Sequence, residues 1–152
     1  MTTKEKMISV ESIMTHLPLE TAAQSKSVHD VAMQMNSANK GSVIIVDDKD
    51  RPLGIITERD IVRKVVAQGK DASRVTAGEV MSKPLISVDP EVNIYDAALV
   101  MTKYRIRRLP AVRDNELLGI VTATDFARHL YENNKKDPML QAMSRFVLIE
   151  HA

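Results

Sequence analysis

The apolar positions of the chain follow a helical spacing in two separate stretches. Within residues 28–35 and again within residues 94–101, apolar side chains occupy positions i, i+3, i+4 and i+7. This spacing places them on one stripe of an α-helix, which buries that stripe against the rest of the fold. Ser27 and Asn93 precede the two stretches and have side chains that favour a helix N-cap. We therefore expect two equivalent amphipathic helices.

A strand pattern follows each of these helices. Residues 42–46 form a short β-branched run, matched by residues 109–112, and a charged turn separates each run from a second one, at 53–57 and 117–122. Paired runs around a short turn predict a β-hairpin. Pro110 has no backbone N–H group, so its strand is expected at a sheet edge or a bulge. Each hairpin leads into a second helical pattern, which Gly69 ends in the first case.

The two sets of elements belong to one internal repeat with a period of about 65 residues. When residues 27–46 are laid over 93–112, Asp30 matches Asp96, and the heptapeptides 54–60 and 119–125 coincide further on. This period is longer than that of a solenoid unit and predicts two small subdomains. The predicted organisation is a first repeat at 1–71, a second at 72–137 and a C-terminal tail at 138–152.

Each repeat opens with a short leading segment, at residues 9–15 and 76–82, in which Ile13-Met14 matches Val80-Met81. The sequence Thr76-Ala77-Gly78-Glu79 has the spacing of a capping box and predicts a short helix. In the tail we expect a helix from Asp137-Pro138 and a short strand over 146–149.

Composition and charge exclude several classes of protein. With 44% hydrophobic and 27% charged residues, the chain is typical of a soluble globular domain rather than of a disordered one. A net charge of +1 and an aromatic content of 3% offer little to nucleic acid. No apolar run approaches the roughly 20 residues of a membrane span. The start also lacks the apolar core of a signal peptide, so we expect a cytoplasmic protein without membrane attachment.

Catalytic and metal-binding patterns are also missing from the sequence. There is no cysteine, which removes disulfides, thiolate catalysis and cysteine zinc sites. The four histidines show no metal-binding pair at i, i+4, and no G-x-S-x-G motif marks a nucleophile. We therefore expect a protein that is not an enzyme and needs no metal and no cofactor.

The motif G-h-h-T-x-x-D, where h is apolar, occurs twice at a strand-to-helix junction. In one interpretation it is structural: Thr57 and Thr122 cap the helices, Asp60 and Asp125 sit at position N3, and the glycine eases the turn. In the other it binds a nucleotide. The threonine hydroxyl at a helix N-terminus can donate to a phosphate, and an ionised aspartate can only accept, as it would from ribose hydroxyls.

With these motifs the sequence resembles the paired CBS domain, or Bateman module, over roughly residues 8–133. The resemblance is carried by residues 13–15 and 80–82, by Asp30 and Asp96, by residues 107–110 and by both G-h-h-T-x-x-D motifs. It implies an α+β fold in which two β-α-β-β-α repeats pack through their sheets about a pseudo-twofold axis. It also implies two clefts for adenosine-containing ligands, and a homodimer formed through the helices.

The resemblance further implies a role for individual residues. The motif aspartate holds ribose, the threonine holds phosphate, and the residue after the glycine lines the base pocket. The corresponding positions are Ile55, Thr57 and Asp60 in the first repeat and Ile120, Thr122 and Asp125 in the second.

The resemblance also implies that basic residues just before the first strand bind the phosphate, and these are Arg107 and Arg108 in the second repeat. The first repeat has Gly41 and Ser42 there, so a phosphate would need Lys40 or Arg59 instead. The resemblance further implies that the leading segments bring Ser9 to the Asp125 site and Thr76 to the Asp60 site. Thr124 and Pro110 complete the predicted ligand-binding set.

Two functions remain open at this stage. The first is a non-catalytic regulatory sensor of cellular energy that binds adenine nucleotides, with AMP favoured over ADP, ATP or an S-adenosyl ligand, and that acts as a homodimer on an effector protein. The second is a ligand-free scaffold for protein–protein interaction, in which the capping boxes are only caps. The pair Arg107-Arg108 favours the first, because two guanidinium groups beside a helix start suit a phosphate.

Overall fold

The computed structural model describes residues 7–150, which form two compact units. The first unit comprises residues 18–86 and 114–117, and the second comprises residues 7–17, 87–113 and 118–150. Each leading segment thus belongs to the unit that contains the other repeat's hairpin. The units are defined by which residues contact one another in space and not by repeat boundaries along the chain. The predicted division of the sequence at residues 71 and 137 therefore stays a prediction.

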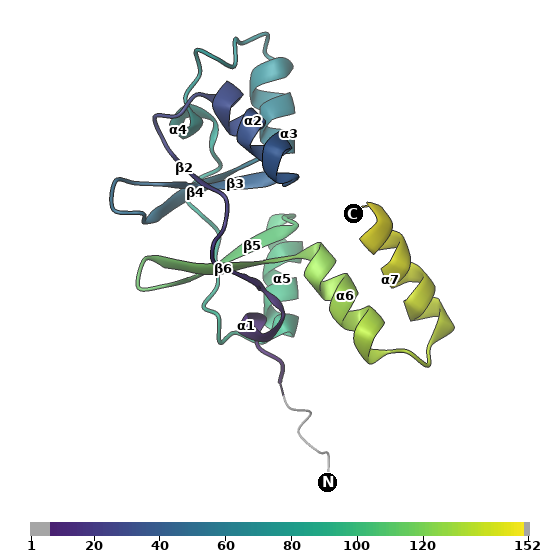
Figure 1. Cartoon of the computed structure of the whole chain (residues 1–152). Coiled ribbons are helices and arrows are strands. Elements are labelled where there is room, and N and C mark those ends of the chain that lie inside the picture. Colours follow the sequence, from purple (N-terminus) through teal and green to yellow (C-terminus); the bar gives the residue numbers. More distant parts are fainter. Residues whose placement is uncertain (1–6, 151–152) are drawn as a thin grey trace. The chain divides into compact units, whose positions relative to one another are not determined.

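The first unit is a three-stranded sheet with helices, in the strand order β2-β3-β4 (Figure 1). Strand β2 pairs with β3 in parallel, and β3 pairs with β4 as the predicted hairpin. Its elements are β2 (Thr21–Ala23), α2 (Val28–Ala38), β3 (Ser42–Val46), β4 (Pro52–Thr57), α3 (Glu58–Ile61), a π-helical turn η1 (Val62–Val66) and α4 (Ala77–Val80).

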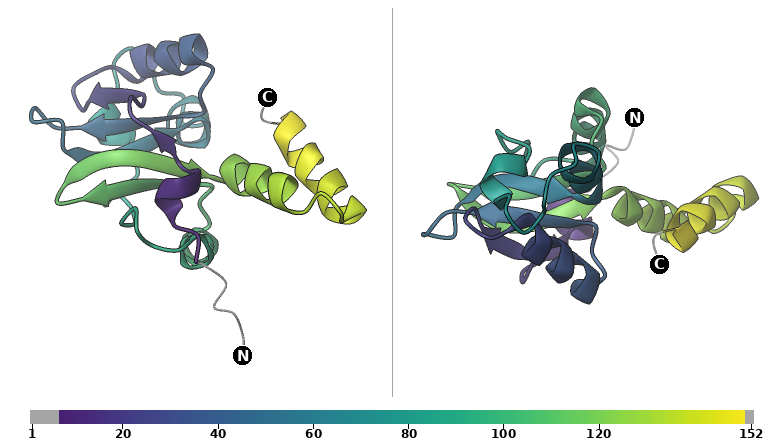
Figure 2. Two further views of the ribbon diagram at one scale, coloured as in Figure 1. Left: turned by 60° about the horizontal axis from the view of Figure 1, so that its bottom comes forward. Right: turned by 90° about the horizontal axis from the view of Figure 1, so that it is seen from above.

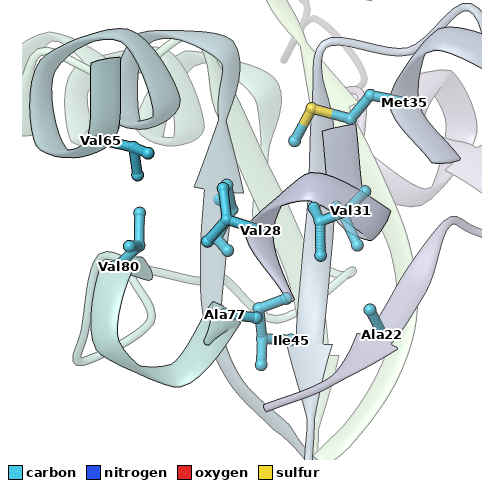
Figure 3. Close-up of a cluster of buried hydrophobic side chains, with 10 residues drawn as sticks. Ala22, Val28, Val31, Met35, Ile45, Val65, Ala77 and Val80 are labelled. Atoms are coloured by element: carbon cyan, nitrogen blue, oxygen red, sulfur yellow. The ribbon is translucent and has the colours of Figure 1, made fainter. Parts of the chain in front are cut away.

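The core of the first unit contains the apolar stripe of α2. Val28, Val31 and Met35 are buried, as the spacing predicts, and Figure 3 shows them over the sheet residues Ala22 and Ile45. At the other end of this cluster the side chains of Val65 in η1 and Val80 in α4 point toward one another. The second leading segment therefore supplies part of the core of the first unit.

The second unit repeats this plan, with the strand order β1-β6-β5. Val88 forms a parallel bridge to Ala111, which corresponds to the β2–β3 pairing of the first unit. Its elements are α1 (Val10–Ile13), β1 (Thr15–His16), α5 (Ile94–Tyr104), β5 (Arg108–Arg113), β6 (Glu116–Thr122), α6 (Ala123–Asn133) and α7 (Pro138–Glu150). The predicted α+β fold is confirmed.

Local signals in the sequence fix the ends of the helices. The Ser27 side chain accepts the Asp30 N–H at 3.1 Å, and the Asn93 side chain accepts the Asp96 N–H at 2.9 Å, which confirms both N-caps. Gly69 adopts a left-handed φ of 64° just beyond η1, so it ends the second helix of the first repeat as predicted.

Residues 146–149 are helical, so the predicted strand in the tail is wrong. They belong to α7, which turns back beside α6 (Figure 2). The Gln141 side chain donates to the Tyr131 carbonyl at 2.7 Å, and the Arg145 guanidinium lies 5.8 Å from the centre of the Tyr131 ring. Packing against α6 outweighs the β propensity of the sequence FVLI. Over residues 7–150, no helix has the length and apolar character needed to cross a bilayer.

Candidate functional site

Both G-h-h-T-x-x-D motifs form complete capping boxes. Thr57 begins α3, and Asp60 Oδ2 accepts the Thr57 N–H at 2.9 Å and the Thr57 hydroxyl at 3.1 Å. Thr122 begins α6, and Asp125 Oδ2 accepts the equivalent two groups at 2.8 and 3.1 Å. In return each threonine Oγ1 accepts the aspartate N–H. The structural interpretation of the threonine and the aspartate is confirmed, and Oδ1 of each aspartate is left for other partners.

The first and third N–H groups of each of these helices have partners within the protein. The Glu58 N–H donates to the Gly41 carbonyl at 3.1 Å, and the Ala123 N–H donates to the Arg107 carbonyl at 3.0 Å. Each helix start is thereby tied to the residue before the first strand of its hairpin. A phosphate bound here would consequently depend on side chains more than on the helix N–H groups that the sequence suggested.

The motif glycines make room for the leading segments rather than easing a turn, so that prediction is wrong. A Cβ atom on Gly54 would lie 2.7 Å from the Ser82 carbonyl oxygen. On Gly119 it would lie 2.7 Å from both the Thr15 carbonyl oxygen and the Met14 sulfur. Both glycines lie inside strands, at the point where the backbone of a leading segment crosses.

Asp60 has two further partners on its second oxygen. Oδ1 accepts the Ser82 hydroxyl at 3.2 Å and forms an ion pair with the Lys64 ammonium at 3.0 Å, and the Asp60 side chain is only 12% exposed. Lys64 also donates to the Val80 carbonyl at 2.9 Å. The carboxylate thus joins η1 to the second leading segment.

Asp125 is more deeply buried than Asp60, with 5% of its side chain exposed, and its second oxygen has a single partner among the described residues. Its Oδ1 accepts Arg128 Nη1 at 3.1 Å, from one turn further along α6. Sequence reasoning did not select Arg128, Lys64 or Ser82. The spacing i, i+4 of Asp60 and Lys64 was a usable signal, whereas Ser82 is 22 residues from Asp60 and gives none.

The basic candidates are distributed unevenly between the units. Arg107 is exposed and directly precedes β5, and Arg108 is the half-buried first residue of that strand. In the first unit Ser42 opens the equivalent strand β3. Lys40 is exposed just after α2, and Arg59 is exposed in the first turn of α3, beside Asp60 in the sequence. Their proposed contacts with phosphate stay predictions.

The apolar candidates lie close to the motifs in the chain. Ile55 and Ile120 are half-buried, and each pairs with the last residue of a leading segment. Thr124 is half-buried in the first turn of α6, and Pro110 is buried in β5, the outer strand of its sheet. The edge position predicted from Pro110 is therefore confirmed, while its contact with a ligand stays a prediction.

Ser9 and Thr76 are the N-cap residues of the short helices α1 and α4 in the two leading segments. Ser9 forms a bridge to Asn93, and Thr76 forms one to Ser27. The Thr76 N–H and hydroxyl donate to Glu79 at 2.7 and 3.0 Å, and these hydrogen bonds lower the pKa of the Glu79 carboxyl. Thr76 is thus hydrogen-bonded within its own helix. The residue of this leading segment that contacts Asp60 is its last one, Ser82.

Sequence relatives share this repeat. The family model described as the CBS domain matches residues 10–67 and 77–132. Protein MK0525 of Methanopyrus kandleri is 44% identical over 119 residues, covering 78% of this chain and 58% of that protein, so the chain spans less than two thirds of this relative. Hypoxic response protein 1 of Mycobacterium tuberculosis is 37% identical over 124 residues, covering 82% of this chain and 80% of that protein.

Solved structures share the fold. The CBS domain pair of protein MJ0100, in complex with 5′-methylthioadenosine and S-adenosyl-L-methionine, is 30% identical with a TM-score of 0.76, over 84% of this chain and 99% of that one. A structure of Hypoxic Response Protein I holds two coordinated zinc ions. Within residues 7–150 of this chain, no group of three or more metal-ligating side chains is arranged to hold a metal ion. With two CBS domains accounting for most of its length, the chain belongs to the CBS domain family and contains a pair of these domains.

Proposed function

We propose that the chain is a non-catalytic regulatory module that binds adenosine ligands at its two G-h-h-T-x-x-D motifs, with AMP as the favoured ligand. The observation that carries the proposal is the pair of largely buried aspartates, each with one oxygen committed to the helix cap and the other facing polar donors. An ionised carboxylate in this position can accept from ribose hydroxyls. The complex of the MJ0100 domain pair with two adenosyl ligands supports this ligand class.

The basic residues support a phosphorylated ligand in the second repeat. Arg107 and Arg108 stand before and at the start of β5, and the Arg107 carbonyl is bound to the start of the helix that carries Asp125. Guanidinium groups bind phosphate through paired, charge-assisted hydrogen bonds. We infer that the second repeat prefers AMP, whereas the first accepts ligands with less negative charge.

Ligand binding should raise thermal stability. A ligand present at about 100 times its dissociation constant, and bound only by the folded state, stabilises by roughly 2.7 kcal/mol. For a chain of this size the expected rise in Tm is roughly 5 to 10 °C. Melting curves with millimolar AMP, ADP, ATP and S-adenosylmethionine test this, with inosine monophosphate as the control for the base. If all four leave Tm unmoved, the interaction scaffold becomes the better explanation.

A homodimer is the second part of the proposal, and it rests on exposed apolar side chains of the helices. In the first unit these are Met33, Val62 and Val66, and in the second they are Tyr95, Leu99 and Leu130. Isolated apolar residues need no explanation, but stripes on several helices favour a twofold contact between copies. Light scattering should give about 34 kDa, twice the 17.0 kDa of the chain, at micromolar concentration. A mass of 17.0 kDa there would contradict the dimer. Val66→Glu should favour the monomer.

A further inference from the structure

The carboxylates of Asp60 and Asp125 differ in how many polar groups contact their second oxygen, Oδ1. An ionised carboxylate offers about four lone-pair positions, two on each oxygen. In both residues Oδ2 already accepts two hydrogen bonds from the capping threonine. Any ribose hydroxyl must consequently be accepted by Oδ1, whose partners decide how readily the site takes a nucleoside.

At Asp60 two groups crowd Oδ1: the Ser82 hydroxyl donates a hydrogen bond to it at 3.2 Å, and the Lys64 ammonium forms an ion pair with it at 3.0 Å. At Asp125 the corresponding oxygen accepts Arg128 at 3.1 Å, and no other partner of Oδ1 lies among the residues that the structure describes. The second carboxylate can therefore accept one more donor as it stands. The first has both Ser82 and the Lys64 ammonium against the same oxygen, so a ribose hydroxyl can reach it only by moving one of them aside.

We propose that Lys64 and Ser82 form an internal latch on Asp60, which occupies the ribose-binding oxygen and which a nucleoside must displace in order to bind in the first repeat. This inference rests on the proposed function, because it assigns Asp60 to ribose. The latch makes the first site weaker for nucleosides than the carboxylate alone would be. It also ties ligand binding to the second leading segment.

The bonds around the latch allow it to open locally. Lys64 holds the end of α4 through the Val80 carbonyl, so its displacement removes one link to the leading segment. The backbone of Ser82 stays paired with Ile55, since each donates its N–H to the other's carbonyl, at 2.9 and 3.2 Å. The side chains can thus move aside while the segment keeps its place, and variants of Lys64 and Ser82 should remain folded.

The test measures adenosine binding by calorimetry in an Asp125→Ala background, where the first site is isolated. Adenosine has no phosphate, so the measurement reports on the ribose and base contacts alone. Lys64→Met should strengthen binding about fivefold, a modest gain because the Lys64 side chain is 44% exposed and its ion pair is screened by solvent. Lys64→Met combined with Ser82→Ala should strengthen it further, to about tenfold or more.

Arg63→Met is the matched control, because it removes the neighbouring cation of η1 and leaves the Lys64 ion pair and the Ser82 hydrogen bond to Asp60 Oδ1 in place. It should leave the affinity for adenosine unchanged. The latch is wrong if Lys64→Met leaves adenosine affinity unchanged or lowers it while the unmodified chain binds adenosine. If neither the unmodified chain nor any variant binds adenosine or AMP, the proposed function fails, and the latch fails with it.

Discussion

Gly119→Val should lower the free energy of unfolding by about 3 kcal/mol or more, at or beyond the upper end of the usual cost of overpacking. Even the first added carbon would lie 2.7 Å from the backbone oxygen of Thr15 and 2.8 Å from Cε of Met14. The methionine side chain could rotate away, but the Thr15 carbonyl belongs to β1, which pairs with β6 at this point. Relief of the contact therefore requires the first leading segment to leave the sheet.

Two other glycines separate this effect from the general cost of replacing glycine. Gly54→Val should be similarly costly, because a Cβ there meets the Ser82 carbonyl oxygen at 2.7 Å. Gly69→Ala meets no atom within 4 Å and should cost only about 1–2 kcal/mol for its left-handed backbone. Urea unfolding followed by circular dichroism measures all three variants. If Gly119→Val costs no more than Gly69→Ala, the close approach does not explain the motif glycine.

The parts of the fold that could be predicted from the sequence are those that depend on neighbouring residues. The stripe on α2, the capping side chains of Ser27 and Asn93 and the hairpin of β3 and β4 are all set within a few positions of the chain. The T-x-x-D spacing of the capping boxes is equally local. Because these signals occur in both halves of the chain, the sequence predicts both the α+β fold and the order of its helices and strands.

What the sequence did not predict depends on contacts between distant segments. The strand expected at 146–149 is a helix because α7 has α6 to pack against, and this partner is not visible from local propensity. The need for glycine at position 119 follows from its close contact with the carbonyl of Thr15, which lies more than 100 positions earlier in the chain. Ser82 reaches Asp60 for the same reason, since the leading segments exchange between the repeats.

One motif can serve both as a helix cap and as a ligand site because a carboxylate has two oxygens. Oδ2 of Asp125 is fixed by the cap, and this fixes where Oδ1 lies without any contribution from a ligand. A site built in this way is preorganised, so little conformational entropy remains to be lost on binding. It also means that removal of the aspartate affects both the stability and the affinity, and the two effects must be measured separately.

Arg108→Ala should weaken AMP binding by about 10- to 100-fold and barely change adenosine binding. A charge-assisted hydrogen bond contributes roughly 1.5 to 3 kcal/mol, and each 1.4 kcal/mol is a factor of ten in affinity. Adenosine has no phosphate, so it has no such bond to lose. Asp125→Ala should weaken both ligands, because both contain the ribose that the carboxylate is proposed to accept.

The measurement is a pair of titrations, with AMP and with adenosine, on Arg108→Ala, Asp125→Ala and Asp60→Ala. Lys103→Ala serves as the control for overall charge, since Lys103 is an exposed cation on α5 of the same unit and should change neither affinity by more than about twofold. Circular dichroism checks that each variant is folded, which matters most for Asp125→Ala because it removes the Asp125 half of the capping box, the two hydrogen bonds accepted from Thr122. If Asp60→Ala abolishes AMP binding while Arg108→Ala and Asp125→Ala leave it intact, AMP occupies the first repeat, and Lys40 or Arg59 must supply the charge that binds its phosphate.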